Sequence, residues 1–119
     1  MAGKIIADTI ETGAGADIST SYVVNGSAKA WCRWSQSGTQ TVNDSLNIAS
    51  ITDTGTGYTT LNMTNSMTSV YHSVSGFGAS GYSMMFNGSP TSSSWPVQNW
   101  YGSAYDNPTS CSQTQGDLA

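Results

Sequence analysis

Charged residues are unusually few in this sequence. Only 8% of the 119 residues are charged, against about 25% in an average soluble protein, and just three of them are basic. With a formal net charge of −4, no basic patch is available to hold a nucleic-acid backbone. No apolar run reaches the roughly 18 residues that a membrane-spanning helix needs. These shortages exclude nucleic acid as a partner and exclude insertion into a membrane.

Side chains suited to catalysis are equally scarce. The chain has one histidine, two cysteines and seven carboxylates, which are scattered singly along it. Acid–base and nucleophilic chemistry needs ionisable groups close together, and Asp44 and Asp53 are the only carboxylates between residues 18 and 105. His72 and two distant cysteines cannot supply the four ligands of a zinc site. We therefore expect no enzyme activity, no catalytic residue, no metal and no cofactor.

The two cysteines, Cys32 and Cys111, lie far apart in the sequence. Two unpaired thiols in a reducing cytosol are the favoured interpretation, because disulfides are rare there. A disulfide that forms late, outside the cell, is the alternative. The N-terminus lacks the apolar stretch of a signal peptide, so we expect synthesis in a cytoplasm without a secretion signal.

Small uncharged polar residues take the place of charge. Ser, Thr, Asn and Gln account for 48 residues, and 13 more are Gly. Thr, Val, Ile and Tyr are common while Glu and Lys nearly vanish, as is typical of strands. Turn signals recur every 8–14 residues or so, which predicts an antiparallel sandwich or barrel. We expect an all-β domain over residues 21–119, a small antiparallel β-sandwich or barrel-like fold, behind an extended N-terminal arm and connector at 1–20.

The arm carries three isoleucines, Ile5, Ile6 and Ile10, followed by a Gly/Ala-rich connector. Apolar side chains this close to a terminus require burial, since termini are disordered unless something ties them down. The arm is either an edge strand that lies on its own domain or a docking segment for a partner or a sister subunit. A single turn near Ala7–Thr12 is the only helix that the sequence tolerates.

Alternation and turn residues predict the strands of the domain. Asp53–Gly57 is the strongest hairpin loop, and broken alternation at Ile48–Ile51 predicts a bulge or bend. After Pro90 the pattern fails. The last ten residues are expected to fray, apart from a final strand near Ser110–Gln113. The predicted strands are Tyr22–Val24, Ala28–Trp34, Thr41–Ile51, Tyr58–Thr64, Met67–Phe77 and Tyr82–Phe86.

Two groups of side chains are candidates for binding. Lys29, Trp31 and Arg33 share one face of the Ala28–Trp34 strand, which is either a solvated face or a surface for a receptor or a subunit. A second group crowds into eleven residues after Pro90. These aromatics are either core residues, the seam of an oligomer, or a surface for glycans. They are Trp95, Trp100, Tyr101 and Tyr105.

Three segments in order resemble a domain that recurs in tailed bacteriophages, usually in tail fibres and other virion appendages. They are Val-Val-Asn-Gly-Ser-Ala-Lys-Ala-Trp at 23–31, Asp-Ser-Leu-Asn-Ile-Ala-Ser-Ile-Thr-Asp-Thr-Gly-Thr-Gly at 44–57 and Tyr-Thr-Thr-Leu-Asn-Met-Thr-Asn-Ser-Met at 58–67. The chain departs from the family at Cys32, Arg33 and Trp34, where Val, Asn and Phe are more usual. The region after about residue 75 varies in the family.

The resemblance implies a virion component, commonly a β-rich homotrimer that contacts the host surface. It implies a short tail fibre or fibre-tip subunit located on the virion. The implied partners are further copies of the same chain, other tail, baseplate or capsid proteins, and a host surface glycan. A capsid decoration or cement protein with a purely structural role is the alternative. In either case Ile5, Ile6 and Ile10 would anchor the arm, and the family has no established catalytic residues.

Overall fold

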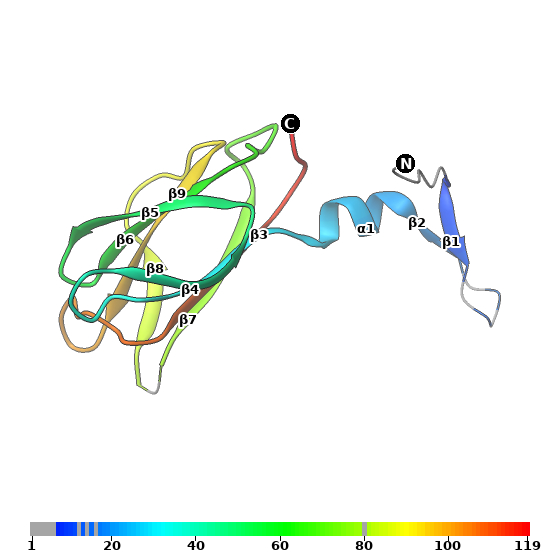
Figure 1. Ribbon diagram of the computed structural model, residues 1–119. Coiled ribbons are helices and arrows are strands. Elements are labelled where there is room, and N and C mark those ends of the chain that lie inside the picture. Colours follow the sequence, from blue (N-terminus) through cyan, green and yellow to red (C-terminus); the bar gives the residue numbers. More distant parts are fainter. Residues whose placement is uncertain (1–6, 12, 14, 16, 80) are drawn as a thin grey trace.

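The body of the protein is a sandwich of two four-stranded antiparallel sheets (Figure 1). The computed structural model describes residues 7–11, 13, 15, 17–79 and 81–119. The first sheet has the order β4-β3-β10-β7, with strands Thr41–Leu46, Ala28–Ser35, Ser110–Gln115 and Ser73–Gly78. The second has the order β5-β6-β9-β8, with strands Ile48–Gly55, Tyr58–Met63, Ser94–Trp100 and Ser83–Phe86. The prediction of a small antiparallel all-β domain is confirmed.

The core lies between the sheets and follows the predicted alternation. On β3, the residues Ala30, Cys32 and Trp34 point inward, and on β6 the inward residues include Leu61 and Met63. Two buried indoles, Trp34 and Trp95, occupy the largest share of this space. Because the core of so small a domain is limited, these two rings supply much of the apolar area that folding buries.

The irregularity predicted at Ile48–Ile51 is confirmed, because the β5–β6 register shifts between Ile48 and Ser50. Just before it, at Asn47, the chain crosses from one sheet to the other. Asn47 separates β4 from β5 and has a positive φ of 57°, which costs Asn less than most residues. Its amide nitrogen donates to Lys29 O at 3.1 Å and to Asn65 O at 3.0 Å, and its Oδ1 accepts from the Asn65 N–H. The single strand predicted over Thr41–Ile51 is therefore wrong: it is two strands in two sheets.

The described residues before Ala28 form a separate small unit beside the sandwich (Figure 1). It consists of β1 (Thr9–Glu11), the antiparallel β2 (Asp17–Ser19) and the helix α1 (Thr20–Gly26). We call this the N-terminal unit. No residue of α1 is buried.

Two local predictions for the N-terminal unit are wrong. The predicted strand Tyr22–Val24 lies inside α1, and the predicted helical turn near Ala7–Thr12 is replaced by β1. The side chain of Ser19 caps α1 by accepting from the Ser21 N–H, and such N-caps favour helix over strand. The capping serine outweighs the strand preference of the valines in this short helix.

The second half of the chain holds the largest corrections. Of the predicted strand Met67–Phe77 only the end is β7, because the Met67 and Thr68 N–H groups donate to Ser92 O and Asp117 O outside any sheet. Past Pro90 there are two strands, β9 and β10. β10 confirms the strand predicted near Ser110–Gln113 and extends it to Gln115, and it lies between β3 and β7 within the first sheet.

The strand order places four connections together at one end of the sandwich. Gln36 N–H donates to Asn107 O, Asn99 N–H to Gly57 O, and Ala79 N–H to Thr109 O. The connections after β3, β5, β7 and β9 therefore meet. Because β3 begins where α1 ends, they meet at the end opposite the N-terminal unit (Figure 1). We call this the distal end.

Candidate functional site

Three tyrosine rings gather at the distal end. The ring centroid of Tyr82 lies 5.2 Å from that of Tyr101 and 5.4 Å from that of Tyr105. Tyr101 and Tyr105 are exposed, as is Trp100 at the end of β9. We call these four residues the distal aromatic cluster. Crowding in the sequence indicated Trp100, Tyr101 and Tyr105, whereas Tyr82 comes from another connection and only the fold brings it in.

Hydrogen bonds within the loop and to the β5–β6 hairpin hold the loop that carries Tyr101 and Tyr105. Tyr101 N–H donates to Ser103 O at 2.9 Å, and Tyr105 N–H donates to Asn99 O at 3.2 Å. The Asp106 carboxylate accepts from Gly57 N–H at 2.7 Å. Gly57 has a positive φ of 79°, and a Cβ there would lie 2.5 Å from the Tyr105 nitrogen. Only glycine permits this close approach of the hairpin to the loop.

A buried polar network lies beneath the loop. Gln36 Oε1 accepts from the Asn99 side-chain amide at 2.6 Å and from Asn107 N–H at 3.0 Å. The Asn99 amide also donates to Ser110 Oγ at 2.8 Å. Because all four residues are buried, these bonds are exchanged for water only at a high cost. The network holds the base of the aromatic loop in one position.

The cluster presents ring faces and hydroxyl groups to solvent. Desolvation, followed by the neighbouring Tyr105 and then Tyr101, raises the pKa of Tyr82 above its usual value. The Tyr82 hydroxyl therefore stays protonated at physiological pH, where it donates and accepts hydrogen bonds. Aromatic residues of this type provide apolar contact area together with a polar end. Such a surface suits a sugar ring or a polypeptide.

Trp95 does not belong to this surface, and its predicted role in receptor or subunit contact is wrong. Its exposure is 0%, because the alternation of β9 turns it inward. Its Nε1–H donates to Ser112 Oγ at 3.1 Å, and its ring meets the edge of His72 at 6.4 Å between centroids. His72 is itself buried, with ring nitrogens 2.6 Å from Thr114 Oγ1 and 2.9 Å from Thr91 O.

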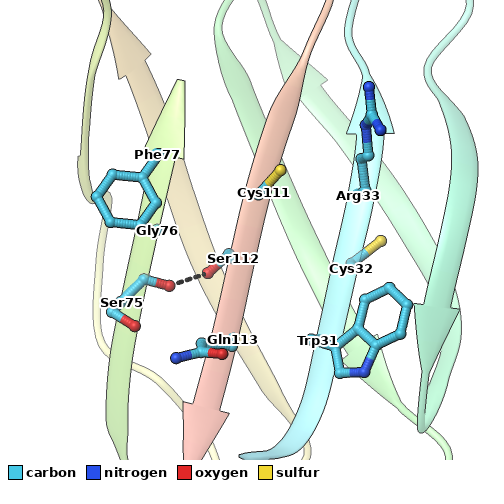
Figure 2. Close-up of a pocket in the computed structure, with 9 residues that line it drawn as sticks. All are labelled: Trp31, Cys32, Arg33, Ser75, Gly76, Phe77, Cys111, Ser112 and Gln113. Carbon is cyan, nitrogen blue, oxygen red and sulfur yellow. Dashed lines mark hydrogen bonds between the residues drawn. The ribbon is translucent and has the colours of Figure 1, made fainter. Parts of the chain in front are cut away.

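A second surface lies on the outer face of the first sheet. Trp31 and Arg33 point outward from β3, as the alternation predicted. Figure 2 shows them on one side of Cys111 and Gln113 of β10, with Phe77 of β7 on the other side. Together they line a groove of about 360 Å³. Sequence reasoning missed Phe77, because its neighbours Gly76 and Gly78 hide the strand pattern.

The cysteines face opposite sides of this sheet. Cys32 points into the core and Cys111 is partly exposed on the groove, and both are free thiols. Burial, reinforced by Cys111 and Asp44, raises the pKa of Cys32 from 9.0 to about 11. This thiol is protonated at any physiological pH, so it is inert as a nucleophile.

The N-terminal unit exposes apolar side chains. Ile10 is 46% exposed and lies opposite Ile18, which is similarly exposed, across the β1–β2 pair. Tyr22, Val23 and Val24 of α1 are exposed as well. Ile5 and Ile6, the other predicted docking residues, lie outside the described residues. An isolated two-stranded hairpin is at best marginally stable, and the exposed side chains of this unit leave it with little buried apolar area.

The remaining ionisable groups have local roles. Asp53 Oδ1 accepts from Gly55 N–H at 3.0 Å within the β5–β6 hairpin, and Asp44 Oδ1 accepts from Ser45 N–H at 2.8 Å. Within the described ranges, no group of three or more His, Cys, Asp or Glu could hold a metal ion. Across the same part of the chain, no helix is long and apolar enough to cross a membrane.

The fold and its two surfaces define an antiparallel β-sandwich with an N-terminal extension at one end and aromatic side chains at the other. No protein-family model matches the chain, and neither a curated protein nor a solved structure matches it.

Proposed function

We propose that this chain is a structural protein of a bacteriophage virion, a short tail fibre or fibre-tip subunit that attaches through its N-terminal unit and takes part in host-surface recognition. The segments at 23–31, 44–57 and 58–67, which resemble virion appendage domains, are the basis for the phage assignment. The sandwich has no catalytic role in this proposal.

The observation that carries the proposal is the separation of two kinds of exposed side chain. Ile10 and Ile18 lie in the N-terminal unit, at the end where the chain enters the sandwich. The distal aromatic cluster lies at the opposite end. Apolar side chains near an entry point suit permanent attachment, and aromatic side chains with hydroxyl groups suit recognition of an outside ligand. A subunit that projects from a particle needs this division.

We further propose that the chain assembles as a homotrimer. A 12.4 kDa sandwich buries a limited core, and association of three copies through their N-terminal units would cover Ile10, Ile18 and the valines of α1. Sedimentation equilibrium of the full chain is expected to give three times the monomer mass, and Ile10→Ser with Ile18→Ser is expected to reduce it. A monomer at all concentrations contradicts this part of the proposal.

Phage carrying variants of this chain test attachment and recognition separately. A chain that lacks residues 1–27 should be absent from purified particles. Tyr101→Ser with Tyr105→Ser should be incorporated normally while host adsorption slows. Tyr71→Ser is the matched control, because Tyr71 is 93% exposed and lies outside the distal aromatic cluster. Normal incorporation of the truncated chain contradicts attachment through the N-terminal unit, and normal adsorption of the double variant contradicts recognition.

A capsid decoration protein is the second candidate. The exposed β1–β2 hairpin favours it, because unpaired strand edges can pair with strands of a neighbouring capsid subunit. Quantitative mass spectrometry of purified particles separates the two. A copy number that scales with the major capsid protein indicates decoration, and one that scales with tail proteins indicates a fibre.

A further inference from the structure

The groove on the outer face of the first sheet has Trp31 and Phe77 as aromatic walls, with Cys111 and Gln113 between them, and its lining is mostly apolar (Figure 2). Strand β10 lies between β3 and β7, and the register places Gln113 opposite both Trp31 and Ser75. Phe77 lies opposite Cys111 in the next row. Two strand spacings, about 10 Å, separate the strands β3 and β7 that carry the walls, a span on the scale of a sugar ring.

The side chains of the groove are open to solvent. Phe77 is 75% exposed, an unusual position for a phenylalanine on a strand, since large apolar side chains normally turn inward. Arg33 is exposed as well, and Trp31 is half-buried. Phe77 therefore contributes little to the core and is available for contact with a ligand.

The positive charge of the sandwich is concentrated beside this groove. The chain has three basic residues and a net charge of −4. Lys4 lies outside the described residues, and the other two, Lys29 and Arg33, both alternate with the inward residues of β3 and flank Trp31. Asp44 lies opposite Arg33 on β4, where one of its oxygens already accepts the Ser45 N–H. The groove thus offers a guanidinium to an anion on an otherwise acidic protein.

We infer that this groove binds an acidic glycan, a short oligosaccharide that carries carboxylate groups. Trp31 and Phe77 supply flat apolar faces for the C–H side of pyranose rings. Arg33 supplies the planar pair of donors that matches a carboxylate. Gln113 and Ser75 supply an amide and a hydroxyl for sugar hydroxyl groups. Mostly apolar walls with a few placed polar groups are the usual construction of a small-ligand site.

This site is distinct from the distal aromatic cluster and goes beyond the function proposed above. It holds for a fibre or a decoration protein alike, so its failure leaves the virion proposal in place. Loss of incorporation in the truncated chain, conversely, has no bearing on the groove.

Titration of the full chain with a panel of acidic sugars tests the inference. The probes are trimers of galacturonate, mannuronate and glucuronate together with sialyllactose, each compared with its neutral methyl ester. Binding is followed by NMR through the Trp31 indole N–H. At least one acidic probe should shift this signal, and its ester should bind about tenfold more weakly, a factor that corresponds to ~1.4 kcal/mol.

Two variants and one control make the test specific. Arg33→Gln should remove the preference for the acid over the ester, whereas Phe77→Ser should weaken both probes equally. Tyr71→Ser, an exposed aromatic outside the groove, should change neither. No shift with any acidic probe overturns the inference. Binding that stays unchanged in Arg33→Gln and Phe77→Ser also overturns it. A change in sedimentation caused by either variant overturns it as well, because it would identify this face as a subunit contact.

Discussion

Hydrogen bonds between buried hydroxyl and amide groups connect the elements of this fold, as ion pairs do in proteins with more charge. Thr59 is fully buried, and its Oγ1 accepts from Trp34 Nε1–H at 3.2 Å and from the Gln36 amide at 2.9 Å. The same hydroxyl donates to Gln40 Oε1 at 2.6 Å. One small side chain therefore pairs three buried or half-buried polar groups, and none of these bonds depends on salt.

Thr59→Val keeps the volume of the side chain but removes its hydroxyl. The Trp34 and Gln36 donors would then be buried without a partner, at a cost of about 1–3 kcal/mol each. We expect urea unfolding to show a loss of about 2–6 kcal/mol in the free energy of unfolding on this basis. Thr60→Val is the matched control, since Thr60 is the next residue and lies on the outer face of β6. Equal losses in both variants contradict this role of Thr59.

The Cys32 thiol makes stability depend on pH in a defined window. Burial raises its pKa in the folded protein to about 11, above the ordinary 9.0. Between these values the unfolded chain loses the thiol proton while the folded chain keeps it, so stability falls as pH rises. Below pH 9 this contribution is fully present. Unfolding free energies from pH 8 to 11 should fall less steeply in Cys32→Ala than in the natural chain, and parallel profiles contradict the assignment.

Among the elements, the features that could be predicted from the sequence are those set by side-chain alternation and by turn residues. The inward and outward faces of β3 and β6 and the hairpin at 53–57 follow from patterns of a few neighbouring residues. β9 is missed because Pro96 lies in it, and proline argues against an interior strand. The buried Gln98 and Asn99 also break its apolar pattern. Gln98 donates to the Tyr58 hydroxyl on β6. The Asn99 amide donates to Gln36 Oε1 and Ser110 Oγ, so the acceptors for both side chains lie on other elements of the fold.

Some residues of the candidate site could likewise be predicted from the sequence, and others could not. Trp100, Tyr101, Tyr105, Trp31 and Arg33 could be selected from crowding and alternation. Tyr82 and Phe77 could not, because their importance arises from strand pairing between distant segments. Trp95 was selected for the same crowding and is buried, since crowding does not tell which way a strand turns its side chains.

Asn47 controls the passage between the two sheets. Asn47→Ala removes four hydrogen bonds and places a poorly suited residue at positive φ, so we expect a loss of about 2–4 kcal/mol. Asn47→Gly keeps the backbone conformation and should lose only the part due to the hydrogen bonds. Chemical denaturation of both variants measures the difference. An alanine variant as stable as the glycine variant contradicts a requirement for positive φ.

For the whole molecule, the sandwich and the N-terminal unit are expected to be thermodynamically separate. The helix that joins them has no buried residue, so its removal exposes little of the core. A chain of residues 28–119 should unfold cooperatively at nearly the Tm of the monomeric full chain. Circular dichroism at low protein concentration measures this. A truncated chain that is unfolded contradicts the separation.

The central claim is that the two ends of this molecule face different partners. The most direct test is a density map of the intact virion that resolves individual strands. We predict that β1, β2 and α1 lie in contact with a neighbouring virion protein or sister subunits, while Tyr101 and Tyr105 face away from the particle. A map in which the distal aromatic cluster is buried against the particle and the N-terminal unit stands in solvent would contradict the account.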